Sequence, residues 1–203
     1  MRKIGAGLQF NVYDLGNGKV LKTHRTRIQM YFTNLLWEPY LIFAPWILKR
    51  KINQAIKDRK DSVSKLKKNL YDQSLLGNLT FENNNIIQDK VKPLKYFLNN
   101  KNFKKILDKY FEFILECWRE GFSDKIYNLD TNNGIDKKGE IILMDIGELS
   151  FNKEEVRKDI LSKRWEHSGF YKRRLKKSLK RYYDNKAKNI LTLKNLNKSW
   201  ESN

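Results

Sequence analysis

The segment Ile141-Ile142-Leu143-Met144-Asp145-Ile146-Gly147-Glu148-Leu149 contains the pattern that best predicts the fold of this chain. Its first four residues form an apolar run, which predicts a short buried strand. The turn-forming sequence Asp136-Lys137-Lys138-Gly139 precedes that run. Asp145 and Gly147 follow it, so we expect an acidic side chain at the point where the strand ends.

Two glycine-containing segments near residue 1 form a second pattern. Gly5-Ala6-Gly7-Leu8-Gln9-Phe10-Asn11-Val12-Tyr13 contains glycines that allow a backbone to approach phosphates closely and present its N–H groups. Leu15-Gly16-Asn17-Gly18 is a strong turn signal, and Lys19-Val20-Leu21-Lys22 returns as a strand. Residues 1–22 therefore predict a β-hairpin, with residues 4–7 as a flexible turn.

In this order, the three segments resemble the protein-kinase-like superfamily, in a small and atypical version. Residues 5–13 resemble its glycine-rich loop, although Phe10 stands at the position of the third glycine. Lys22 resembles the lysine that reaches the nucleotide phosphates from the adjacent strand, and Asp145-Ile146-Gly147 resembles the Asp-Phe-Gly motif. The resemblance spans residues 4–149.

The resemblance implies an α+β protein with a bilobal protein-kinase-like fold. Residues 1–92 would form a nucleotide-binding lobe with an antiparallel sheet and a helix, and residues 93–203 a reduced, mainly helical lobe. A hairpin predicted over residues 79–91 would complete the sheet, beside a Lys-rich amphipathic helix predicted over residues 46–70. A helix predicted over residues 102–120, apolar on one side, would lead to the catalytic loop.

The resemblance also implies a site for ATP and Mg²⁺, and an activity that transfers a phosphoryl group to an alcohol. The residues implied to bind the nucleotide are Gly5, Gly7, Val12, Lys22, Asp89 and Val91. Asp145 would act in catalysis by binding the metal ion, and Asn132, thirteen positions earlier, would be the second ligand. Carboxylate and amide oxygens are ligands that suit Mg²⁺.

The catalytic base has no residue at the expected spacing. The position five before Asn132, where the family has its aspartate, is Tyr127, which cannot act as a carboxylate base. Asp124 and Asp130 are the nearby carboxylates, and we favour Asp124 because it lies where the loop begins. A longer loop, with Asn128 as the metal ligand four residues after Asp124, is the alternative.

The acid that would pair with Lys22 is open between Glu38, Asp58 and Asp61. The helix predicted over residues 46–70 contains no glutamate. Lysines surround Asp58 and Asp61 at helical spacing, which is typical of a solvated helix face.

The formal charge of +19 arises from 42 basic and 23 acidic residues. Lysine outnumbers arginine 31 to 11, which is more typical of a solvated surface than of base recognition by arginine. Residues 151–203 nevertheless carry 16 basic and 6 acidic residues. This basic tail is a candidate contact for a phosphorylated acceptor or an anionic membrane, and less favourably for nucleic acid.

The stretch over residues 28–48 is rich in aromatic residues, but Glu38, Pro39 and Pro45 interrupt it. It therefore predicts no transmembrane span, and residues 31–48, like the basic tail, are a candidate peripheral membrane contact. Cys117 is the one cysteine, so no intramolecular disulfide can form, and the two histidines lack metal-ligand spacing. No signal peptide is recognised, and we expect a cytoplasmic protein.

Two other classes of function compete with the phosphotransferase. The first is a pseudokinase-type module that binds a nucleotide or a partner without catalysis, which Tyr127 favours. The second is a binder of nucleic acid or of an anionic membrane surface through the basic tail.

Overall fold

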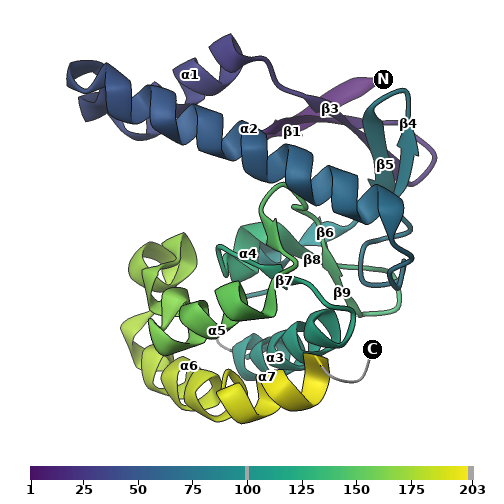
Figure 1. Ribbon diagram of the computed structural model, residues 1–203. Coiled ribbons are helices and arrows are strands. Elements are labelled where there is room, and N and C mark those ends of the chain that lie inside the picture. The colour runs from purple at the N-terminus through teal and green to yellow at the C-terminus, as the bar shows by residue number, and fades with distance from the viewer. Residues whose placement is uncertain (99–100, 201–203) are drawn as a thin grey trace. The chain divides into compact units, whose positions relative to one another are not determined.

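The computed structural model describes residues 1–98 and 101–200 (Figure 1). The chain is an α+β protein that forms two compact units. The first comprises Met1–Leu70 and Asn78–Lys90, and the second comprises Tyr71–Gly77 and the chain from Val91 onward. The sequence-based division assigned residues 71–77 to the first lobe, whereas the structure includes them in the second unit.

The first unit consists of a five-stranded antiparallel sheet and helices. Its strands are β1 (Arg2–Ala6), β2 (Phe10–Asp14), β3 (Lys19–His24), β4 (Thr80–Glu82) and β5 (Asn85–Asp89). Its helices are α1 (Arg27–Trp37), the 3-10 helix η1 (Pro39–Phe43) and α2 (Pro45–Lys68). The strand order is β1-β2-β3-β5-β4.

Strand β1 corrects one sequence-based expectation. Residues 4–7 were predicted as a flexible turn, but Gly5 lies within β1 and pairs with Val12 after a shift of register that follows Lys3. The turn is confined to the residues after Ala6, where the Gly7 N–H donates to the Phe10 carbonyl (3.0 Å). Glycines in an irregular edge strand produce the same sequence pattern as glycines in a flexible turn. The pattern alone therefore did not reveal the strand.

The two predicted hairpin turns are confirmed, and both use positive φ angles. Gly16 and Gly18 have φ values of +82° and +79° between β2 and β3. Asn83 and Asn84 have φ values of +46° and +64° between β4 and β5. Glycine and asparagine adopt this left-handed region more readily than other residues, which is why these turns could be predicted.

Helix α2 runs along the sheet of the first unit (Figure 1). Pro39 and Pro45, which interrupt the aromatic stretch, begin η1 and α2, where the missing proline N–H costs no helical hydrogen bond. The helical core of this unit is formed by buried residues from α1, η1 and α2, namely Met30, Leu41, Leu48, Ile52 and Ala55. Leu8, from the turn between β1 and β2, packs against that core.

The second unit is mainly helical, with short strands. Its helices are η2 (Leu94–Tyr96), α3 (Phe103–Arg119), α4 (Leu129–Asn132), α5 (Lys153–Leu161), η3 (Arg164–His167), the π-helix η4 (Phe170–Arg174), α6 (Lys177–Ile190) and α7 (Leu193–Trp200). Its strands are β6 (Lys92–Pro93), β7 (Ser123–Asp124), β8 (Asn133–Ile135), β9 (Ile141–Leu143) and β10 (Leu149–Ser150).

The centre of the second unit is α3, which confirms the helix predicted over residues 102–120. Its apolar face is buried, and its Phe111 ring lies 5.5 Å from the ring of Tyr183 in α6. Gly121 follows with a φ of +76° and, as predicted, the helix ends there.

The short strands of the second unit form two small sheets. One has the order β6-β8-β9, and the other pairs β7 with β10. The hairpin was predicted over residues 79–91, but β5 ends at Asp89, and Pro93 pairs with Gly134 in a separate strand. A Cβ atom on Gly134 would lie 2.5 Å from the Val91 side chain, so this close approach requires glycine.

Candidate active site

The second unit brings together Asp124, Asn132 and Asp145. Pairing of β7 with β10 sets Leu149 opposite Asp124, so the segment before the predicted loop and the segment after Asp145 lie side by side. The hairpin of β8 and β9 begins just after Asn132 and ends just before Met144. The segments that contain Asp124, Asn132 and Asp145 therefore lie next to one another, where these short strands begin or end.

Asp124 accepts hydrogen bonds on both carboxylate oxygens. The Ile126 N–H donates to Oδ1 (2.9 Å), and the Asn132 side-chain amide donates to Oδ2 (3.1 Å). Burial raises the pKa of Asp124 to about 7, because desolvation outweighs these two hydrogen bonds, and the nearby Asp145 carboxylate raises it further. The site thus holds a carboxyl group that exchanges a proton near neutral pH.

Asn132 is fixed by its backbone as well as by its side chain. Its carbonyl oxygen accepts the N–H groups of Met144 (2.7 Å) and Asp145 (3.1 Å). Asp145 is exposed, and its Oδ1 accepts the Gly147 N–H at 3.1 Å. The Asn132 amide nitrogen donates to Asp124, and the Asn132 amide oxygen accepts a long hydrogen bond from the Thr131 hydroxyl (3.4 Å). That oxygen and the Asp145 carboxylate are the hard oxygen donors at this point.

The two carboxylates considered as the catalytic base, Asp124 and Asp130, have different partners in the structure. The Asp130 carboxylate is buried and pairs with the Arg174 guanidinium, whose Nε lies 2.6 Å from Oδ2. Desolvation raises the pKa of Asp130, and Arg174 opposes that rise. Asp130 is therefore held by an arginine, whereas Asp124 is held by Asn132.

The two remaining residues considered for this loop have structural contacts. Tyr127 is 1% exposed, has a φ of +53°, and its ring lies edge-on to that of Trp165 at 6.5 Å. Asn128, the alternative metal ligand, accepts the Phe170 N–H on its Oδ1 at 3.0 Å. Packing thus explains Tyr127, and Asn128 connects the loop to η4.

The first unit aligns several residues of the predicted nucleotide site. Gly5 pairs with Val12, Val12 pairs with Lys22, and Lys22 pairs with Ile86, so these residues form one row across β1, β2, β3 and β5. Directly paired residues share a face of the sheet. Lys22 is only 6% exposed. Nothing lies within 4 Å of a Cβ atom built on Gly5 or Gly7, so the space beside both glycines is open.

Two arginines hold the turn between β1 and β2, and the sequence analysis did not identify them. Arg25 Nη1 donates to the Gly7 carbonyl (2.6 Å), and Arg59 Nη1 donates to the Gln9 carbonyl (3.0 Å). The Arg59 guanidinium carbon lies 6.0 Å from the centre of the Phe10 ring. These contacts fix the turn and add positive charge next to it, which favours an anionic ligand.

The candidate acids for pairing with Lys22 lie off the buried face of α2. That face consists of Leu48, Ile52, Ala55, Arg59, Ser62 and Leu66. Glu38 pairs with Lys51, Asp58 accepts from Gln54 at 3.2 Å, and Asp61 is exposed. Spacings of three and four residues in the sequence place Arg59 on this buried stripe, so its burial could be predicted from helical periodicity.

Asp89 and Val91 were predicted to contact the nucleotide. Asp89 Oδ2 accepts a hydrogen bond from the Asn78 side-chain amide at 2.6 Å, so this carboxylate has a structural partner within the first unit. Val91 is half-buried and belongs to the second unit, where its side chain lies against Gly134. Both roles stay predictions.

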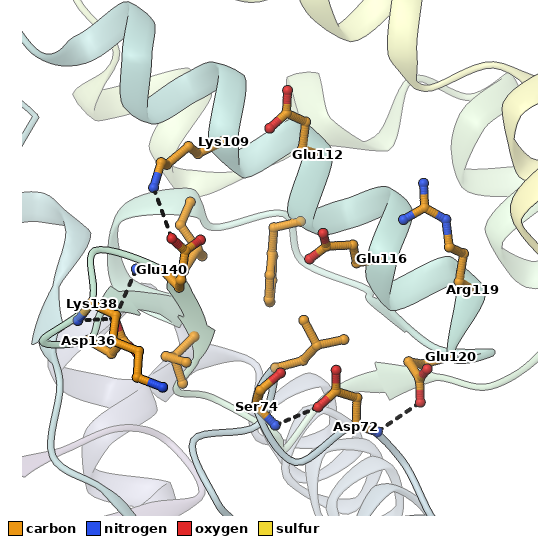
Figure 2. Close-up of a pocket in the computed structure, with 14 residues that line it drawn as sticks. Asp72, Ser74, Lys109, Glu112, Glu116, Arg119, Glu120, Asp136, Lys138 and Glu140 are labelled. Atoms are coloured by element: carbon orange, nitrogen blue, oxygen red, sulfur yellow. Dashed lines mark hydrogen bonds and ion pairs between the residues drawn. The ribbon is translucent and has the colours of Figure 1, made fainter.

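A separate pocket of about 560 Å³ lies in the second unit, and none of the predicted site residues lines it (Figure 2). Its wall includes the carboxylates Asp72, Glu112, Glu116, Glu120, Asp136 and Glu140. Lys109 donates to the Gly139 carbonyl (2.8 Å) and lies 3.3 Å from Glu140. Burial raises the pKa of Glu116. The six carboxylates outnumber the three cations of the wall, Lys109, Arg119 and Lys138, so the wall does not favour a nucleoside triphosphate.

No known protein family and no curated protein match this sequence. Within residues 1–98 and 101–200, no cluster of three or more histidine, cysteine, aspartate or glutamate side chains could hold a metal ion. No helix among these residues is long and apolar enough to cross a membrane.

Proposed function

We propose that this chain is an ATP- and Mg²⁺-dependent phosphotransferase with a bilobal protein-kinase-like fold. The observation that carries the proposal is the arrangement of Asp124, Asn132 and Asp145. The Asn132 side-chain amide donates to the Asp124 carboxylate, and the Asn132 carbonyl accepts the Asp145 N–H. A candidate base and two oxygen donors next to it are what phosphoryl transfer requires.

In this proposal Asp124 orients the acceptor hydroxyl and takes up its proton. The hydrogen bonds from Ile126 and Asn132 hold the carboxylate in place. Its pKa of about 7 suits a group that must accept a proton at neutral pH and release it again.

Asp145 and Asn132 would hold the metal ion. Mg²⁺ commonly takes one or two protein ligands together with water and phosphate oxygens, so this donor set fits, even without a cluster of three acidic residues. When bound, the ion would neutralise phosphate charge. The Gly147 N–H orients the Asp145 carboxylate for this role.

The first unit would bind the nucleotide through the row that contains Gly5, Val12 and Lys22. The open space beside Gly5 and Gly7 allows a phosphate to approach the backbone. Lys22 would contact the phosphates, and Arg25 and Arg59 would keep the turn between β1 and β2 in one conformation.

We infer that the acceptor carries negative charge. Helix η4 adjoins the loop that follows Asp124, because the Phe170 N–H binds Asn128 and Arg174 binds Asp130. Lys172 and Arg173 in the same helix are exposed. A phosphorylated alcohol would complement this basic border of the loop.

The test is binding and turnover of ATP by the full chain with Mg²⁺, against a panel of neutral and phosphorylated alcohols. Asp145→Asn should abolish Mg²⁺-dependent ATP binding measured by calorimetry. Asp124→Asn should keep ATP binding and lower kcat by about 10²–10⁴-fold, the usual contribution of a general base. Asp61→Asn, which changes another exposed aspartate, is the matched control for Asp145→Asn and should change neither property.

Unchanged ATP binding by Asp145→Asn would refute the proposed site. Binding without turnover of any acceptor would instead support the alternative of a pseudokinase-type module. Binding of nucleic acid that weakens steeply with salt, without any ATP binding, would support the second alternative, a nucleic-acid binder.

A further inference from the structure

The first unit exposes a concentrated apolar surface. Nine of the fourteen exposed large hydrophobic side chains in the described part of the chain lie between residues 28 and 46. We call these nine the apolar patch, and they are Ile28, Tyr31, Phe32, Leu36, Trp37, Tyr40, Ile42, Phe43 and Trp46. Their exposed fractions range from 37% at Tyr31 to 85% at Phe43. Scattered exposed hydrophobics are ordinary, but nine of them on α1, η1 and the first turn of α2, which pack against one another, mark an interaction surface.

The α1 residues of the apolar patch face away from the core of the first unit. Ile28, Phe32 and Leu36 recur at every fourth position and form an exposed stripe, whereas Met30, Thr33 and Asn34 on the inward side are buried. The Asn34 side chain donates to the Met30 carbonyl at 2.9 Å, which satisfies the buried amide nitrogen within the helix itself. A stripe of large apolar side chains in water is unfavourable unless something else covers it.

The residues of the patch and of its border indicate what covers it. Two tryptophans and two tyrosines contribute to the patch, and such rings suit the interface between hydrocarbon and water. Arg27, Lys49 and Arg50 are exposed at its two ends in the sequence. Glu38 is the one acidic residue between positions 27 and 51, and it pairs with Lys51. The patch is therefore apolar and aromatic, and exposed basic residues flank it in the sequence.

We propose that the apolar patch docks this chain on the surface of an anionic lipid bilayer. The aromatic and aliphatic side chains enter the interface, and Arg27, Lys49 and Arg50 contact the negative headgroups. A second copy of the chain is a poorer occupant, because apposed patches would bring the same three cations together in a protein of net charge +19. The docking is peripheral and does not depend on the phosphotransferase activity.

The test is flotation of the full chain with two kinds of vesicles. One contains phosphatidylcholine alone, and the other contains equal parts of phosphatidylcholine and phosphatidylglycerol. The parent should float with the mixed vesicles. The triple variant Phe32→Ser, Leu36→Ser and Phe43→Ser should lose about tenfold or more in partition coefficient, because three exposed apolar side chains no longer enter the interface. These side chains are exposed, so the variant should keep the circular-dichroism spectrum of the parent.

Matched variants separate the patch from general hydrophobicity and charge. Leu70→Ser, Tyr96→Ser and Leu161→Ser remove three equally exposed apolar side chains outside the patch and should leave partition unchanged. Arg27→Gln, Lys49→Gln and Arg50→Gln should weaken binding to mixed vesicles. Glutamine substitutions at Lys172, Lys177 and Arg181, which are exposed in the basic tail, should weaken binding to mixed vesicles less.

Three results would overturn the proposal. In the first, the parent floats with neither kind of vesicle. In the second, the patch and control variants lose partition equally. In the third, light scattering shows a dimer that the triple patch variant dissociates, which would assign the patch to a second copy of the chain.

Discussion

Helices α3 and α1 both carry an apolar stripe at helical spacing, but they turn it in opposite directions. In α3 the stripe is buried, and Leu107 and Trp118 are fully enclosed. In α1 the stripe of Ile28, Phe32 and Leu36 is exposed, while Met30 and the polar residues Thr33 and Asn34 are buried. Periodicity therefore identifies an amphipathic helix without telling which side faces the protein.

The two helices also depend on different interactions. Helix α3 begins at Asn102 without a side-chain capping hydrogen bond, so its stability comes from packing. Helix α1 has a complete capping box, in which the Thr26 hydroxyl accepts the Gln29 N–H (3.2 Å) and the Gln29 side chain accepts the Thr26 N–H (3.1 Å). A helix that buries little apolar area relies more on such local hydrogen bonds.

The largest effect should come from the buried stripe of α3. Leu107→Ala removes a fully buried side chain and should lower the free energy of unfolding by about 2–5 kcal/mol, measured by urea denaturation with circular dichroism. Lys105→Ala, on the exposed side of the same helix, is the control and should cost less than about 0.5 kcal/mol. An equal loss from both variants would mean that α3 is not the core helix of its unit.

Much of the fold followed from residues with strong local preferences. The apolar side of α3, the positive φ of Gly121, and the turns at Gly16 and Asn83 all belong to patterns that a short window contains. In the candidate site, the choice of Asp124 over Asp130 came from its place at the beginning of the loop. The hydrogen bond from Asn132 is consistent with that choice.

The features of the fold and the site that could not be predicted depend on contacts between residues far apart in the sequence. Strands β7 and β10 have two residues each, which is too short for any periodicity to show. The pairing of Asp130 depends on Arg174, which lies 44 positions later in the sequence. Likewise, the bond from Arg59 to the Gln9 carbonyl spans 50 positions, and no local pattern encodes it.

A moderate effect should come from the capping box of α1. Thr26→Ala leaves the Gln29 N–H without its acceptor and should cost about 1 kcal/mol of unfolding free energy. Thr26→Ser keeps a hydroxyl at the cap and should restore most of this loss, as measured by urea denaturation. If alanine and serine behaved alike, local hydrogen bonds would not be what stabilises α1.

The smallest effect should come from the exposed stripe of α1. Leu36 is 81% exposed, so Leu36→Ser should change the free energy of unfolding in water by less than about 0.5 kcal/mol. The Leu36 side chain contributes to stability only when the stripe is covered, because an apolar side chain stabilises a state through the apolar area that is removed from water. Anionic vesicles should therefore raise the melting temperature of the parent more than that of Leu36→Ser, since a ligand stabilises the form that binds it. A loss of several kcal/mol in water would show that Leu36 is already packed, and that α1 and α3 do not differ in the direction of their stripes.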